Sequence, residues 1–149
     1  MKKKKVILII GVVLVLVVSY VLISINSDIR KLERRIDVNL PKSSNLIYIK
    51  NKIGWFGEGA IISVLNVDEN QIEALFYSID EGKPYELFTD EEFETEVNHV
   101  IDTFLTGISE EHRPDWNNDY DWVDGSNNRT VYYIYDYKTD TLYIIENVF

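Results

Sequence analysis

The chain has 149 residues, no cysteine and a formal net charge of −10. This length leaves room for one ordinary domain, or for one small domain together with a membrane segment. Without cysteine, the chain forms no disulfide framework, no thiolate metal site and no lipid attachment at a cysteine. The surplus of carboxylates argues against nucleic acid as a partner, because two polyanions repel each other.

An uncharged run at residues 6–25 follows four lysines at the start of the chain. As a helix this run would be about 30 Å long, which matches the hydrocarbon core of a bilayer. It is longer than the apolar part of a signal peptide, and no small-residue cleavage site follows it. The sequence therefore predicts an uncleaved transmembrane helix at residues 6–25, with the lipid bilayer as its surroundings.

The orientation of this helix is predicted from the flanking charges. Residues 1–5 form a basic tip, and such clusters stay on the cytoplasmic side of a membrane. Basic residues also lie between positions 30 and 35, so the inverted orientation stays open as an alternative. We expect a single-pass protein of the cell membrane with its N-terminus in the cytoplasm and its C-terminal domain outside.

Residues 26–40 are predicted to form a juxtamembrane stalk that continues the anchor helix into water. One helical face would carry apolar residues at spacings of four and three: Ile25, Ile29, Leu32 and Ile36. The simplest interpretation is a solvated extension of the helix, and the alternative is a weak dimer contact along residues 25–36. Pro41 is expected to end the helix and to begin an acidic domain at residues 41–149.

The first half of this domain predicts two strands and a short helix. Residues 46–50 and 60–67 are rich in Ile, Val and Leu, as strands are. Three glycines within residues 54–59 indicate a hairpin loop with positive φ angles between the two strands. Asp68, with Gln71 three residues later, has the spacing of a capping box and predicts the start of a helix.

A second helix is predicted from Thr89, which stands at the N-cap with Glu92 at the third helical position. Its buried face should hold six apolar residues: Phe93, Val97, Val100, Ile101, Phe104 and Leu105. Gly107 is the residue type that commonly follows a helix C-terminus, so the helix should end near it.

The last part of the chain predicts a long polar loop at residues 108–129 and a hairpin with strands at 131–137 and 142–148. The resulting order of elements is ββααββ. This order indicates an α+β fold, with a small antiparallel sheet that carries two helices on one face.

The loop Gly54-Trp55-Phe56-Gly57-Glu58-Gly59 occurs between Pro41 and a Lys-Pro connector at residues 83–84. With the strand and short helix that follow it, this segment resembles small uncharacterised membrane-anchored, lipoprotein-like domains of low-GC Gram-positive bacteria. The resemblance covers residues 41–149 loosely and implies an architecture. It implies no functional residue and no activity.

Trp55 and Phe56 are adjacent at the tip of the predicted hairpin. Adjacent side chains in extended backbone point to opposite sides, so at least one of the two rings is expected to be exposed and able to bind a partner. The alternative interpretation is that one ring packs over the edge of the sheet.

Oxygen-bearing residues alternate in the long loop at the first four ligand positions of an EF-hand: Asp115, Asn117, Asp119 and Asp121. The pattern then departs from an EF-hand. Tyr120 stands where glycine is needed, and Ser126 stands where a bidentate glutamate belongs, so Asp124 would have to contribute. We expect either a weak Ca²⁺ site or a solvated loop whose Asn and Asp residues form local turns.

The same loop carries three aromatic residues among these polar groups: Trp116, Tyr120 and Trp122. Flat aromatic faces next to amide and carboxylate groups are suited to glycan or peptide recognition. The alternative is that the rings anchor the loop to the body of the domain.

No catalytic motif is found. The chain lacks cysteine and a nucleophile elbow, and it has only two histidines. We therefore expect a non-enzymatic, membrane-tethered interaction or accessory domain of the bacterial cell envelope, with regulatory and immunity-type roles included. Its partner would be an envelope or membrane protein. The alternative is a glycan- or cation-sensing module that uses the loop at residues 110–125.

Overall fold

A computed structural model describes residues 2–55, 57–80, 89–125 and 130–148; the side chains of residues 2–10, 22 and 24–27 lie outside this description. The chain divides into two compact units, Met1–Asp37 and Val38–Phe149.

The first unit is one helix, α1 (Lys2–Ile36), which contains both the apolar run and the basic segment after it. The helix ends at Ile36, earlier than the expected end before Pro41, and the next residue, Asp37, has a φ of 56°, which is typical of the residue after a helix C-terminus. Large apolar side chains between Val12 and Ile23 are exposed along α1. Within the portion of the chain that the structure describes, none of the helices combines the length and the hydropathy that crossing a membrane requires.

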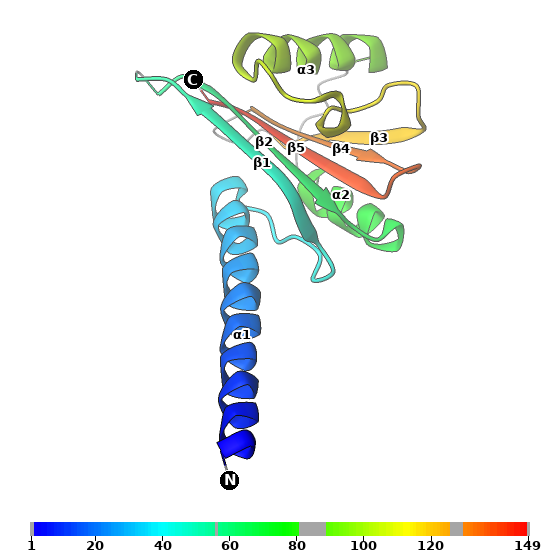
Figure 1. The fold of residues 1–149 in the computed structure, drawn as a ribbon. Coiled ribbons are helices and arrows are strands. Elements are labelled where there is room, and N and C mark those ends of the chain that lie inside the picture. Colours follow the sequence, from blue (N-terminus) through cyan, green and yellow to red (C-terminus); the bar gives the residue numbers. More distant parts are fainter. Residues whose placement is uncertain (1, 56, 81–88, 126–129, 149) are drawn as a thin grey trace. The chain divides into compact units, whose positions relative to one another are not determined.

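The second unit is built on a five-stranded antiparallel sheet with the strand order β1-β2-β5-β4-β3 (Figure 1). Its strands are β1 (Asn45–Ile53), β2 (Gly59–Asn66), β3 (Tyr120–Asp124), β4 (Thr130–Asp136) and β5 (Thr141–Val148). Its helices are α2 (Ile72–Asp80) and α3 (Asp90–Phe104), with short 3-10 turns η1 (Glu69–Gln71) and η2 (Glu110–His112). The predicted α+β class and antiparallel sheet are confirmed.

The predicted order ββααββ is wrong, because a fifth strand lies in the segment that was expected to be a loop. Strand β3 pairs with β4 and places Trp122 opposite Ile134. It has five residues, two of them aspartates, which are uncommon in strands. Its pairing with β4 stabilises it, and this contact with a later part of the chain is invisible in the local pattern.

The helices cover the two faces of the sheet instead of sharing one. The apolar side of α3 packs on the face that holds Ile62 of β2, Ile134 of β4 and Ile145 of β5. On the opposite face, the Tyr135 hydroxyl donates to the Val67 carbonyl, just before η1 and α2, and Figure 1 shows α2 and α3 on opposite sides of the sheet. Because β2, β4 and β5 are buried on both faces, each face needs its own cover.

The two helix starts illustrate one confirmed and one wrong prediction. Thr89 accepts a hydrogen bond from the Glu92 amide, and the Glu92 carboxylate accepts one from the Thr89 amide, so the capping box is present. At Asp68 no side-chain cap forms, and the chain enters η1 before α2 begins. Gln71 instead accepts a hydrogen bond from the Ser43 hydroxyl at 2.8 Å.

Candidate functional site

Two backbone hydrogen bonds close the hairpin that joins β1 to β2. The Gly54 amide donates to the Glu58 carbonyl at 2.7 Å, and the Gly57 amide donates to the Gly54 carbonyl at 3.1 Å. Gly57 has a φ of 89° and Gly59 a φ of 152°, as the glycine pattern predicted. Trp55 is therefore carried on a turn that backbone hydrogen bonds close.

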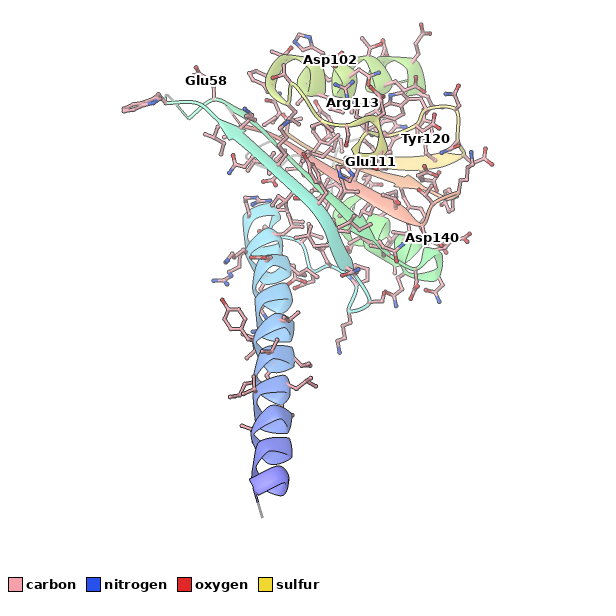
Figure 2. The ribbon with its side chains drawn as sticks, viewed as in Figure 1. Glu58, Asp102, Glu111, Arg113, Tyr120 and Asp140 are labelled. Atoms are coloured by element: carbon pink, nitrogen blue, oxygen red, sulfur yellow. The ribbon has the colours of Figure 1, made fainter. Side chains whose placement is uncertain are left out.

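Trp55 lies at this tip and is fully exposed, with 102% of its reference surface accessible. Phe56, the other half of the predicted pair, lies outside the described residues. Glu58 at the same turn is labelled in Figure 2 and lies at the outer end of the hairpin. A fully exposed tryptophan is unusual because its ring buries a large apolar area when it is covered.

Three isoleucines of β1 are exposed as well: Ile47, Ile49 and Ile53, each between 45% and 53% exposed. We call these three residues and Trp55 the hairpin surface. Strand β1 is the outermost strand beside β2, so nothing in the described sheet covers its other edge. The alternation of the isoleucines with polar residues was visible in the sequence, but which of them would stay exposed was not.

The face of β1 opposite the exposed isoleucines is basic. Lys50 and Lys52 alternate with the isoleucines, and β1 contains no acidic residue. The Lys50 ammonium donates to the Thr106 carbonyl at 2.8 Å, just beyond the end of α3. In a strongly acidic protein, this strand is thus a local basic edge.

The aromatic residues of the long loop are attached to α3. Three hydrogen bonds make this attachment: from Trp122 to Asp90 (3.0 Å), from Tyr120 to Glu94 (2.6 Å) and from Trp116 to Asn98 (3.1 Å). The three acceptors are four residues apart and therefore share one face of the helix. A fourth bond, from Arg113 to Asp102 at 2.9 Å, continues the row, and Figure 2 shows this pair and Tyr120 beside α3.

The rings of this loop also pack on the core. Trp122 stacks on Phe93 with ring centres 3.9 Å apart, and Trp116 meets the same ring edge-on at 6.4 Å. Tyr120 meets Trp116 edge-on at 5.2 Å. The polar atom of each loop aromatic is thus already bonded within the protein, and the rings hold the loop against α3.

The five residues of the expected calcium site are not gathered around one point. The Asp115 carboxylate accepts two hydrogen bonds from Asn117, at 2.9 and 3.1 Å, and these bonds lower the pKa of Asp115. The backbone carbonyl of Asp119 accepts from the Tyr137 amide. Asp121 and Asp124 are three residues apart in β3, so they point to opposite faces. Among the residues that the structure describes, no group of three or more His, Asp and Glu could hold a metal ion.

A hollow of about 740 Å³ lies elsewhere, lined by Asp68, Glu69, Asn70, Glu73, Tyr137 and Asp140. Sequence reasoning missed it because its walls come from positions far apart in the chain. The carboxylates of its lining make this hollow acidic. The pKa of Tyr137 is raised to about 12, first by a hydrogen bond to Asp121, then by burial, and then by the nearby carboxylates.

The tyrosines of the sheet predict a loss of stability in alkali. Burial, followed by the charges of Asp136 and Asp115, raises the pKa of Tyr143 to about 12, and Tyr143 is only 4% exposed. The pKa of Tyr143 is thus higher in the folded protein than in the unfolded chain, where it is near 10. The free energy of unfolding therefore keeps this contribution below pH 10 and loses it as pH rises from about 10 through 12. For Tyr143 alone the expected loss is about 2–3 kcal/mol.

Urea unfolding followed by circular dichroism at pH 8, 10 and 11.5 measures this loss, and tyrosinate absorbance gives the ionisation itself. The protein in concentrated urea is the control, because its tyrosines should ionise near their ordinary pKa of about 10. A free energy of unfolding that stays constant to pH 11.5 would contradict the prediction.

Compared with known proteins, the chain matches no protein-family model, no curated protein and no solved structure. The resemblance to small membrane-anchored domains therefore rests on the sequence pattern alone, which is the glycine-aromatic loop with the strand, short helix and Lys-Pro connector around it. What the domain does has to follow from the physical chemistry of its own surface.

Proposed function

We propose that the protein is a membrane-tethered, non-enzymatic interaction domain of the bacterial cell envelope that binds another envelope or membrane protein through the hairpin surface. The observation that carries this proposal is the fully exposed Trp55 on the hairpin that follows β1, the strand that carries three exposed isoleucines. Tryptophan is among the residues that most often dominate the energy of protein interfaces.

The membrane tether is supported by the apolar run at residues 6–25, which follows a basic tip and is part of α1. Exposed apolar residues lie along α1 from Val12 to Ile23. A helix that is apolar on all sides is stable only in apolar surroundings. The basic tip favours a cytoplasmic N-terminus, which places the acidic domain outside the cytoplasm.

The chemistry of the surface favours a protein as the partner. A chain with a formal net charge of −10 is repelled by nucleic acid and by anionic lipid head groups. An exposed aromatic ring beside aliphatic side chains gains most when a shaped apolar surface covers it. Regulatory and immunity-type roles both fit this class, since each acts by occupying another protein.

The loop at residues 110–125 has a structural role in this proposal, because its aromatic side chains bond to α3 and pack on Phe93. The alternative, a glycan- or cation-sensing loop, makes a different prediction. Retention of the protein on cell-wall glycan, lost in Trp116→Ala and kept in Trp55→Ala, would favour that alternative.

Site-specific photo-cross-linking tests the proposed surface. A benzophenone amino acid replaces Trp55 in the full-length protein in native membranes, and the control replaces Tyr77 of α2, which is 71% exposed. We expect one discrete protein adduct at position 55 and none of the same mass at position 77. The same adducts at both positions, or none at position 55, would contradict the proposal.

A quantitative step follows from the identified adduct. The purified partner should bind the full-length protein in detergent, and Trp55→Ala should weaken the affinity by about thirtyfold, as expected for a central interface residue. An affinity unchanged by Trp55→Ala would show that the cross-link reports proximity without binding energy.

A further inference from the structure

Within the described sheet, the free edge of β1 presents backbone groups that pair with no other strand, in a known register. The Gly54 amide bonds to the Glu58 carbonyl, and the pairing continues with Ile53 opposite Gly59 and Lys52 opposite Ala60. Bonded and non-bonded pairs alternate along an antiparallel ladder. The even residues of β1 therefore bond to β2.

The odd residues, Ile49, Asn51 and Ile53, point their amide and carbonyl groups away from β2. No other strand of the described sheet lies on this side. Three residues thus offer up to six backbone hydrogen bonds to an extended chain.

The side chains of β1 determine which side chains an added strand should carry. On one face, Ile49 and Ile53 are exposed and need apolar neighbours. On the other face, Lys50 and Lys52 lie at alternate positions and favour carboxylates directly across. A strand with alternating apolar and acidic residues satisfies both faces at once.

A second copy of this chain fits the edge poorly. An antiparallel self-pairing that aligns Asn51 with Asn51 of a second copy places Lys50 opposite Lys52 twice. Moving the register by one bonded pair places Lys50 opposite Lys50. Like charges directly across a ladder are destabilising, and lysines on edge strands commonly prevent self-association.

An irregularity in the ladder limits how far pairing can extend. The register between β1 and β2 shifts between Leu46 and Tyr48, so the regular part of the edge is residues 48–53. A bulge of this kind turns the strand and ends straight pairing. The edge therefore accepts a short strand and not an extended sheet.

We propose that the partner presents to β1 a short extended segment of alternating apolar and acidic residues, which joins the sheet at the free edge of residues 48–53. This inference rests on the proposed function and names the chemistry and geometry of its contact. Backbone bonds to Ile49, Asn51 and Ile53 would supply general affinity, and Lys50 and Lys52 would select for acidic side chains.

The test uses the full-length protein in detergent and a fluorescent peptide of about eight alternating valines and glutamates, the length of a short strand. Fluorescence anisotropy measures binding. A peptide of alternating valines and lysines is the control, and we expect it to bind at least about tenfold more weakly. Equal binding of the two peptides would overturn the acidic preference.

Two substitutions examine the backbone and the charge separately. Asn51→Pro removes an outward amide without breaking the β1–β2 ladder, and Asn51→Ala keeps that amide. We expect Asn51→Pro to bind the glutamate peptide about tenfold more weakly than Asn51→Ala. Lys52→Glu should weaken the binding of the glutamate peptide and strengthen the binding of the lysine peptide. Equal binding by both Asn51 variants, with unchanged circular dichroism, would overturn edge pairing.

The outcomes separate this inference from the proposed function. If the peptide fails to bind while cross-linking at position 55 still gives a partner whose affinity depends on Trp55, the strand-addition mode is wrong and the interaction surface stands. If both the peptide and the cross-link at position 55 fail, both proposals are overturned.

Discussion

Phe93→Ala is expected to lower the free energy of unfolding by about 3–5 kcal/mol, the usual cost of removing a buried aromatic ring. Phe93 is 1% exposed, and its ring stacks on Trp122 at 3.9 Å. It also meets Trp116 and Tyr132 edge-on, at 6.4 and 5.6 Å. The substitution therefore leaves a cavity and removes the support of two loop tryptophans.

Urea unfolding of the full-length protein in detergent, followed by circular dichroism, measures this loss. Thr95→Ala is the matched control on the same helix, because Thr95 is exposed and its hydroxyl donates to the Glu91 carbonyl of its own helix. The control should change stability by no more than about 0.5 kcal/mol. A loss below about 1 kcal/mol for Phe93→Ala would show that α3 is not held by this ring.

Gly59→Ala is expected to cost about 3 kcal/mol or more, because both the backbone and the available space require glycine. Gly59 has a φ of 152°, and an added Cβ would lie 2.0 Å from the Lys52 carbonyl oxygen. Relief of this contact would require the first residues of the β1–β2 ladder to separate. The same change should also disturb the turn that carries Trp55.

Gly57→Ala separates the two causes. Gly57 also has a positive φ, 89°, but an added Cβ would meet nothing within 4 Å. Its expected cost is therefore that of the backbone alone, about 1 kcal/mol. Thermal unfolding of both variants gives the comparison, and a Gly57 variant as unstable as the Gly59 variant would contradict the role assigned to the close approach.

Local signals in the sequence predicted α3 well, whereas the same capping-box spacing at Asp68 formed no side-chain cap. The capping box of Thr89 and Glu92 depends on residues three apart, and it forms as expected. The apolar periodicity of α3 predicted Phe93 and Val97 as buried, and both are. Both features leave a signal within a single helix: the spacing of the cap and the period of the apolar residues.

The features that were missed depend on distant partners. Strand β3 is stabilised by β4, and the division of α2 and α3 between two faces follows from the burial of the central strands on both sides. For the candidate site, the glycine pattern predicted the turn at Trp55. The exposure of Ile49 and Ile53 depends on which strand lies at the edge, and strand order cannot be read from the sequence pattern of one strand.

The hydrogen-bond row between α3 and the following loop has a consequence for chain entropy. Its four pairs span 11, 18, 26 and 32 residues and are nested one inside another. Once Arg113 is bonded to Asp102, the formation of each further pair orders only a few more residues on either side. Because the entropy lost on closing a loop grows with its length, this nesting lets β3 be brought alongside α3 in short steps instead of through one long closure.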